Sequence, residues 1–448
     1  MLSQAYTGKM ALRYFKSDEE CPQMASSCRI WVLHLRHLNA CWGTRKVGSP
    51  CTHKSRIMRN FFTTFAFTLT FASALGITAY ATTAPAYATE AKNTADMIAT
   101  ADEKLKTEIE GYWKKFPGRA GIAIYTPFSD EIIGKRQTER FPQQSVSKMW
   151  VALTILEQEA AGKFSLDKRI RVSRDDIVVF SQPLKNYLDG RDSFDMSLRE
   201  LLAHSINASD NLANNVLLRV AGGPQVINQM LERRKVQSIR FGPGEVLLQS
   251  AIAGLEWQPE YRKGNAFKAQ RSRIPMSKRK SALDAYLETP LDGAAPGTIA
   301  LVMKRFSERD ANDPGAKLLK LMAGTYTGRT RLRSGLAPGW RLAHKTGTGQ
   351  VLESISTAIN DVGVMKAPDG CVYPVAVMIA ETRAGREVTN GFMQNVARAI
   401  TRHHDFIHPK AKAAEAKPKP KQPAKPPKTG DNDNKKTTMP KVSKLFQP

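Results

Sequence analysis

The sequence has few cysteines after its first 57 residues. Five cysteines occur in 448 residues, and Cys371 is the only one that follows residue 58. The spacing of the first four matches no zinc template, and the sequence has no H-x-H or H-E-x-x-H pattern. We therefore expect no metal site, and we interpret Cys371 as a small core residue. The four early cysteines are Cys21, Cys28, Cys41 and Cys51.

Several other features of binding proteins are also missing. No long internal repeat, glycine-rich phosphate loop or RNP-type signature is present, and Gly-Pro-Gly at 242–244 is no dinucleotide fingerprint. The net charge is +26, but more than half of this excess lies in residues 1–88 and 410–448. Charge alone is therefore weak evidence for nucleic acid. We expect no organic cofactor and no nucleic-acid partner.

The two ends of the chain differ in composition from its middle. Met58-Arg59-Asn60 is followed by an uncharged apolar run over 61–77 and then by Ala86-Tyr87-Ala88. This order is typical of a signal peptide over 58–88, so we expect export to the periplasm or the medium; an uncleaved anchor helix is the alternative. Residues 1–57 are then expected to be a wrongly assigned N-terminal extension.

The C-terminal segment, residues 410–448, is rich in lysine, proline and alanine. Such a composition buries no core, so we predict a disordered tail. Its charge favours weak, salt-screened contact with anionic envelope material.

Residues 89–409 are predicted to form one α/β domain. Residues 120–127 and 372–382 are typical of strands, while 149–163 and 193–221 have helical patterns. Since helices separate the first and last strands, distant segments must close the sheet. A basic insertion at about 257–290 shows no clear periodicity, and we predict a solvated loop there.

A serine and a lysine stand one helical turn apart at the start of the predicted helix. Ser145 precedes Lys148 by three residues, so the two side chains share a face and the amine can lie beside the hydroxyl. A serine becomes a good nucleophile only when a neighbouring base takes its proton. A helix N-terminus also offers free N–H groups to a developing oxyanion.

Two further motifs follow in a defined order. Ser-Asp-Asn occupies 209–211 and Lys-Thr-Gly occupies 345–347. With S-x-x-K, these motifs resemble those of the class A β-lactamases and the related penicillin-binding D-alanyl-D-alanine peptidases. The resemblance extends over about residues 95–405. It implies an antiparallel β-sheet flanked by helices, together with an all-α lobe.

The resemblance also implies roles for the motif residues. Ser145 would be the acylated nucleophile, Lys148 its activator and Ser209 the proton relay to the leaving nitrogen. Asn211 would hold the substrate amide. The further implied substrate-binding residues are Lys345, Thr346, Gly347, Thr348, Arg331 and Phe180. Among these, Lys345, Thr346 and Arg331 would face the substrate carboxylate, and the N–H groups of Ser145 and Thr348 would form the oxyanion hole.

A glutamate that hydrolyses the acyl-enzyme distinguishes a lactamase from a peptidase. Glu245 aligns with the family's E-x-x-L-N loop, where Gln249 replaces the asparagine and Pro243 replaces the usual arginine. The resemblance makes Glu245 the base for the deacylating water, with a raised pKa. It makes Asn215 the residue that braces this loop.

Three functions remain open from the sequence. The first is an exported, monomeric serine β-lactamase, and the second is a penicillin-binding peptidase that acts on cell-wall peptides. The third is a non-catalytic envelope-binding protein that uses the basic segments. The complete set of reactive groups favours an enzyme.

Overall fold

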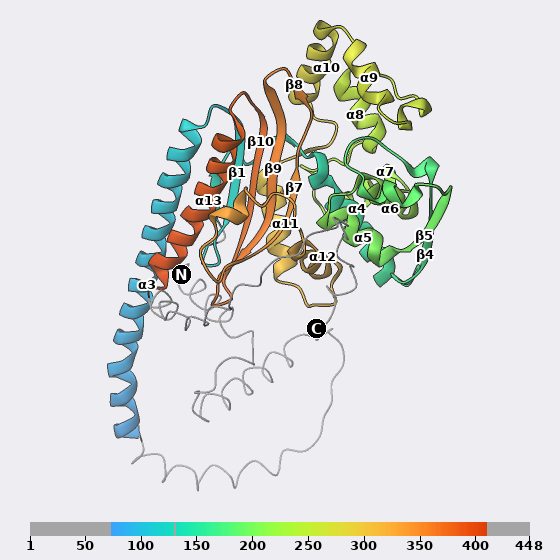
Figure 1. Ribbon diagram of the computed structural model, residues 1–448. Coiled ribbons are helices and arrows are strands. Elements are labelled where there is room, and N and C mark those ends of the chain that lie inside the picture. Colours follow the sequence, from blue (N-terminus) through green and yellow to red (C-terminus); the bar gives the residue numbers. More distant parts are fainter. Residues whose placement is uncertain (1–72, 130, 410–448) are drawn as a thin grey trace, which may run out of the picture. The chain divides into compact units, whose positions relative to one another are not determined.

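The computed structural model describes residues 73–129 and 131–409 (Figure 1). Contacts divide the chain into the units 1–87 and 88–448, and the fold below belongs to the second. The predicted N-terminal extension, residues 58–72 of the predicted signal peptide and the predicted tail lie outside the described residues. Within those described ranges, no helix combines the length and apolar character needed to cross a membrane.

The central sheet is antiparallel, with the strand order β2-β1-β10-β9-β7 and with β8 paired to β9. The first strand of the domain pairs with the last, Ile122 facing Val377. This pairing confirms that segments far apart in the sequence close the sheet. The strands are β1 (Gly118–Tyr125), β2 (Ile132–Lys135), β7 (Arg341–Gly347), β8 (Val351–Leu352), β9 (Ile355–Lys366) and β10 (Val372–Thr382).

Helices cover both faces of this sheet, so its central strand β10 is buried on two sides. On β10, Val375 and Val377 enter one hydrophobic cluster, while Ala376 and Met378 enter the other. This alternation follows from the two-residue period of a strand. Helix α13 (Arg386–Ile407) and the C-terminal part of α3 (Ser73–Lys115), which includes Leu105 and Ile109, lie side by side over the first face (Figure 1).

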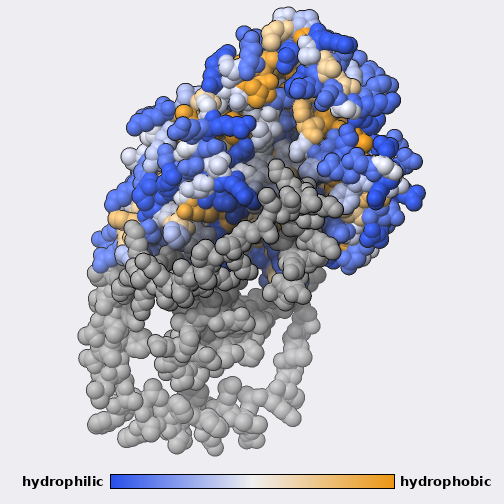
Figure 2. Space-filling view, in the orientation of Figure 1, coloured by the Kyte–Doolittle hydropathy of each residue, from blue (hydrophilic) through white to orange (hydrophobic). Residues whose placement is uncertain are grey.

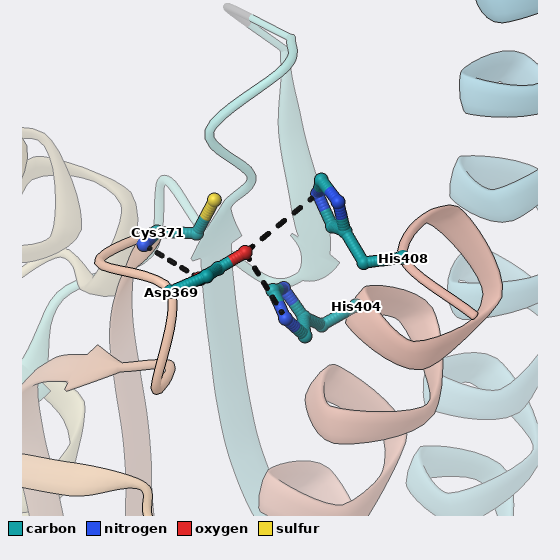
Figure 3. Close-up of side chains that lie close together, drawn as sticks. All are labelled: Asp369, Cys371, His404 and His408. Carbon is teal, nitrogen blue, oxygen red and sulfur yellow. Dashed lines mark hydrogen bonds and ion pairs between the residues drawn. The ribbon is translucent and has the colours of Figure 1, made fainter. Parts of the chain in front are cut away.

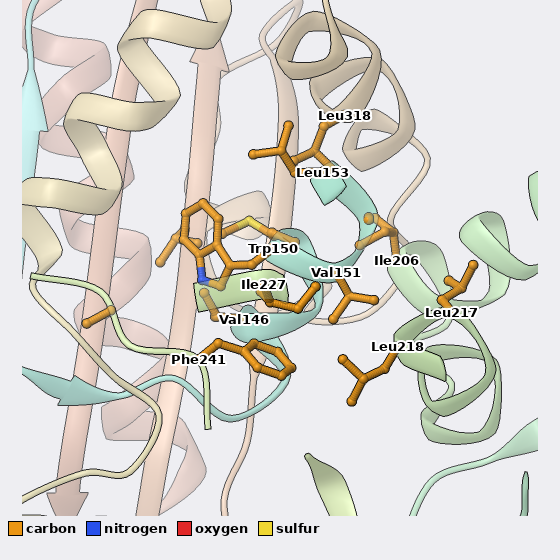
Figure 4. Close-up of a cluster of buried hydrophobic side chains, with 14 of the residues drawn as sticks. Val146, Trp150, Val151, Leu153, Ile206, Leu217, Leu218, Ile227, Phe241 and Leu318 are labelled. Carbon is orange, nitrogen blue, oxygen red and sulfur yellow. The ribbon is translucent and has the colours of Figure 1, made fainter. Parts of the chain in front are cut away.

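The second face packs on the helical lobe, whose central element is α4 (Lys148–Ala160). Trp150 and Val151 of α4 are fully buried, among side chains from several other helices (Figure 4). The surrounding helices are α5 (Leu198–Asn207), α6 (Asn211–Ala221), α7 (Pro224–Arg233), α8 (Glu245–Ala253), α11 (Pro296–Ser307) and α12 (Pro314–Ala323). Residues 149–156 of α4 are apolar except for Thr154, and all of them are buried, so this part of the helix is covered on every side.

Two short strand pairs complete the lobe and correct one prediction. The segment 193–221 is not helical throughout, because its first five residues form β5 (Ser193–Ser197), which pairs with β4 (Arg169–Ser173). Ser197 then caps α5 by accepting the N–H of Glu200. The other pair is β3 (Phe141–Pro142) with β6 (Gly293–Ala294).

The prediction of a solvated loop in the basic insertion is wrong. Two helices, α9 (Ala266–Arg273) and α10 (Met276–Glu288), occupy most of it. Their basic residues are largely exposed, but Phe267, Leu283 and Tyr286 are buried. Figure 2 shows hydrophobic patches among the hydrophilic surface where α8–α10 lie. These three buried side chains pack the insertion against the rest of the domain. Apolar residues are too sparse in the segment to show a helical period in the sequence.

Candidate active site

The three sequence motifs meet at one cleft, with a volume of about 320 Å³. The S-x-x-K serine comes from a 3-10 turn, η1 (Gln144–Ser147), that leads into α4, and the K-T-G residues end β7. Ser209 and Asp210 of the S-D-N motif link α5 to α6, and Asn211 is the first residue of α6. The lining residues are Gln144, Ser145, Phe180, Ser181, Ala208, Ser209, Asn211, Glu245, Gln249, Thr327, Gly328, Arg331, Thr346, Thr348, Gly349 and Gln350.

Lys148 lies beside the candidate nucleophile, as the spacing predicts. Its Nζ is 2.7 Å from Ser145 Oγ and 2.6 Å from Asn211 Oδ1. Lys148 is buried, and burial lowers the pKa of its ammonium group, against the opposing charges of Glu245 and Asp210. A buried amine of lowered pKa is suited to take a proton from an adjacent hydroxyl.

Ser209 joins the two lysines of the cleft. Its Oγ accepts a 2.8 Å hydrogen bond from Lys345 Nζ and lies 3.4 Å from Lys148 Nζ. Burial, followed by the charges of Lys148 and Arg331, holds the pKa of Lys345 well below its usual range. Ser209 itself has a positive φ of 58°, a strained backbone conformation of the kind found at functional sites. Ser209 is therefore placed to carry a proton between the cleft and either amine.

Glu245 forms part of the cleft wall at the first residue of α8. Its Oε1 accepts a 2.9 Å hydrogen bond from Asn211 Nδ2. Removal from bulk water raises the pKa of the Glu245 carboxyl, against the charge of Lys148. Glu245, the predicted deacylation base, thus contacts the same asparagine as Lys148. Its raised pKa makes the carboxylate more basic.

The other end of the cleft is rich in hydrogen-bond donors. Arg331 donates to the carbonyls of Gly347 and Asn360 at 2.8 and 2.7 Å, and to Thr348 Oγ1 at 2.6 Å. Thr346 Oγ1 lies 2.7 Å from Thr327 Oγ1. These groups can receive an anionic substrate group, with Arg331 fixing the end of β7. A Cβ on Gly347 would lie 2.4 Å from a backbone oxygen, so the strand requires glycine there.

Phe180 lies at the rim of this cleft, 47% exposed. Its ring packs edge-on against Phe267 of the insertion, at 5.6 Å between centroids. Arg271 of α9 lies over the same ring and donates to Gln350 Oε1 at 2.7 Å. The insertion therefore contributes a cation to the rim, which the sequence analysis missed because Arg271 is one of many basic residues in that segment.

Behind the nucleophile lies a buried polar network that the sequence analysis also missed. Gln144, which has a positive φ of 50°, donates its backbone N–H to Asp292 Oδ2 at 2.6 Å. Its Nε2 donates to the Tyr286 hydroxyl at 2.6 Å, and that hydroxyl donates to Asp292 Oδ1 at 2.9 Å. Gln249 Nε2 donates to Gln144 Oε1 at 2.7 Å. Helix α10 thus holds the turn that precedes Ser145.

Asn215, which is predicted to brace the Glu245 loop, has a side-chain hydrogen bond to another segment. Its Nδ2 donates to the carbonyl of Asp176 at 3.2 Å, so the contact it makes is with the segment after β4. The residues that hold the start of α8 are Asn211, through Glu245, and Gln249, whose Oε1 accepts from Gln350 Nε2 at 2.9 Å. The Gln249 side chain thus contacts both Gln144 and Gln350.

Comparison with known proteins decides the family. The model of the "Beta-lactamase enzyme family" matches residues 103–404. The chain belongs to this beta-lactamase enzyme family. It is 24% identical over 297 residues to the beta-lactamase VEB-1 of Pseudomonas aeruginosa, covering 66% of this chain and 89% of that one. It is 27% identical over 296 residues to the extended-spectrum beta-lactamase PER-1 of the same species, covering 65% and 85%.

Solved structures of the beta-lactamase family share the fold. The TLA-1 extended-spectrum beta-lactamase aligns with a TM-score of 0.54 and 21% identity, over 68% of this chain and 99% of that one. The predicted antiparallel sheet flanked by helices, with its helical lobe, is therefore confirmed. The predicted membership in a family of serine β-lactamases is confirmed as well.

Proposed function

We propose that this member of the beta-lactamase family hydrolyses β-lactams through an acyl-enzyme on Ser145. The observation that carries the proposal is Lys148, whose amine contacts both Ser145 Oγ and Asn211 Oδ1, while Asn211 Nδ2 contacts Glu245. One asparagine thereby joins the group that activates the nucleophile to the group that activates water.

In acylation, Ser145 Oγ attacks the lactam carbonyl carbon and the C–N bond of the ring breaks. Neutral Lys148 takes the hydroxyl proton, which its lowered pKa permits. The ring nitrogen receives a proton from Ser209 Oγ, which is resupplied through its contacts with Lys148 and Lys345. The N–H groups of Ser145 and Thr348 would hold the oxyanion.

In deacylation, Glu245 takes a proton from a water molecule, whose oxygen attacks the acyl carbon. The bond to Ser145 Oγ breaks, and that oxygen takes up the proton that Glu245 removed from the water, so both residues return to their starting states. The net reaction adds one water across the lactam C–N bond. The raised pKa of Glu245 supports this role, since a more basic carboxylate is a better proton acceptor. The substrate carboxylate would lie against Lys345, Thr346 and Arg331.

The test is to follow a chromogenic cephalosporin and the intact protein mass together. Wild type is expected to turn over repeatedly with little adduct. Glu245→Gln should acylate and then stall with one equivalent of adduct, a loss of about 10²-fold or more in turnover, as for a missing general base. Ser145→Ala should give no adduct.

The matched control is Glu260→Gln, an exposed glutamate in the segment that follows α8, which should behave as wild type. A lasting adduct on wild-type Ser145 would instead indicate a peptidase, and the absence of burst and adduct would indicate a binding protein. Unchanged turnover in Glu245→Gln would overturn the deacylation mechanism.

Export, a monomeric state and envelope contact by the tail are further proposals. Export is supported by the signal-peptide pattern of residues 58–88, and envelope contact by the lysine content of 410–448. Cell fractionation tests export, and light scattering tests the monomer. Unchanged envelope association at low salt after deletion of 410–448 would contradict the tail's role.

A further inference from the structure

At the end of the sheet away from the active site, four metal-ligating side chains converge. His404 lies in the last turn of α13, and His408 follows that helix directly. Asp369 and Cys371 lie in the hairpin between β9 and β10. The ligand atoms of these four residues all lie within 4.8 Å of one another. Figure 3 shows the imidazoles extending from the helix toward the Asp369 carboxylate.

The two imidazoles carry unused nitrogen atoms that face this point. Nε2 of His404 and Nε2 of His408 are shielded from solvent and have no hydrogen-bond partner among the described residues. They lie 3.5 and 4.0 Å from Asp369 Oδ2. Buried polar atoms are rarely left without a partner, so such a pair calls for an explanation such as an ion.

Neighbouring groups hold the ligands in suitable orientations. The backbone N–H of Cys371 donates to Asp369 Oδ1 at 3.0 Å, which leaves Oδ2 turned toward the histidines. The Tyr373 hydroxyl lies 3.3 Å from His404 Nδ1, so this ring is anchored through its other nitrogen. Metal-ligating histidines typically have such a partner on the nitrogen opposite the metal.

We propose that Asp369, Cys371, His404 and His408 bind one Zn²⁺ ion, which clamps the end of α13 to the β9–β10 hairpin. Thiolate, imidazole and carboxylate together suit zinc rather than magnesium or calcium. Ligand atoms in a tetrahedral zinc centre lie about 3.5 Å apart, given bond lengths near 2.1 Å. Small side-chain rotations therefore complete the site.

Binding is coupled to loss of a proton. Zinc binds the thiolate form of cysteine, so Cys371 releases its proton when its sulfur binds the metal. Four protein ligands close the coordination shell, as in structural rather than catalytic zinc sites.

The site lies too far from the cleft to take part in the reaction. On β7, Gly347 pairs with Asn360 at the cleft, whereas Arg341 pairs with Lys366 beside the hairpin. Six residues of strand correspond to about 20 Å. We therefore expect zinc to change the stability of the chain without changing its turnover.

The test uses the full chain with Cys21, Cys28, Cys41 and Cys51 replaced by serine, so that Cys371 is its sole thiol. Co²⁺ should bind one to one and give a thiolate-to-cobalt charge-transfer band, and Zn²⁺ should displace it. Zn²⁺ should also raise the Tm relative to the same chain in EDTA. Cys371→Ser should abolish the band, and His408→Ala should weaken Zn²⁺ binding by more than about tenfold.

The matched control is His403→Gln, because His403 neighbours His404 but its Nε2 contacts Asp102 at 2.8 Å instead. This variant should keep the cobalt band. Each variant's Tm shift is measured against its own metal-free form, so an intrinsic loss of stability cancels. A band equally strong in His408→Ala, or no Tm shift with Zn²⁺ in the unmutated site, would overturn the proposal.

Discussion

Replacing Tyr286 by phenylalanine tests whether the insertion holds the nucleophile turn. Tyr286 is 5% exposed, and its hydroxyl accepts from Gln144 Nε2 and donates to Asp292 Oδ1. Phenylalanine keeps the ring but leaves both groups unpaired. An unpaired buried polar group costs about 1–3 kcal/mol, so for two such groups we expect the free energy of unfolding to fall by about 2–6 kcal/mol.

The assay is urea unfolding at neutral pH, followed by tryptophan fluorescence. The control is Tyr187→Phe, because Tyr187 is 51% exposed, and an exposed change of this kind should stay within about 0.5 kcal/mol. We also expect slower acylation in Tyr286→Phe, since Gln144 directly precedes Ser145. A stability within 0.5 kcal/mol of the control, together with unchanged acylation, would refute the role assigned to α10.

Three further predictions follow from the same geometry. Gly347→Ala places a Cβ 2.4 Å from Gln143 O and should lower the free energy of unfolding by about 1–3 kcal/mol in the same urea assay. Gly391→Ala is the control, because nothing lies near the added Cβ, and its free energy of unfolding should stay close to that of the wild type. Burial raises the pKa of Asp292 from 3.8 to about 6. Because the folded state favours the protonated carboxyl, about 3 kcal/mol of the free energy of unfolding is lost as the pH rises from about 4 to 6. Asp292→Asn should remove this loss when the free energy of unfolding is measured across that pH range. Phe180→Ala should raise KM for a cephalosporin while changing stability by less than about 1 kcal/mol, because the ring lies exposed at the rim; an unchanged KM would contradict its contact with substrate.

Much of the active site was predictable because its motifs are local. The three-residue spacing of Ser145 and Lys148 places them on one helical face whatever the rest of the chain does. The strand over 372–382 was readable because a doubly buried strand needs a continuous apolar run. The roles predicted for Ser209, Glu245 and Lys345 came from the family resemblance, which rests on the order and spacing of motifs in the sequence.

The groups that position these residues were not predictable in the same way. Asp292 and Tyr286 follow Gln144 by more than 140 residues, and a single buried tyrosine in a basic segment leaves no periodic signal. The hydrogen bond of Asn215 to the Asp176 carbonyl was not predictable for a related reason. Its position in the sequence does not say which of two neighbouring segments its amide will reach.

The sequence by itself determined the reactive groups, the strands over 120–127 and 372–382, and the buried helix α4, because these depend on residue type and short-range period. The tertiary structure decided how the groups interact. Burial against distant segments lowers the pKa of Lys148 and raises that of Glu245, and folding brings the β9–β10 hairpin to the end of α13. Desolvation and convergence depend on contacts between residues far apart in the chain, and only the folded chain fixes these contacts.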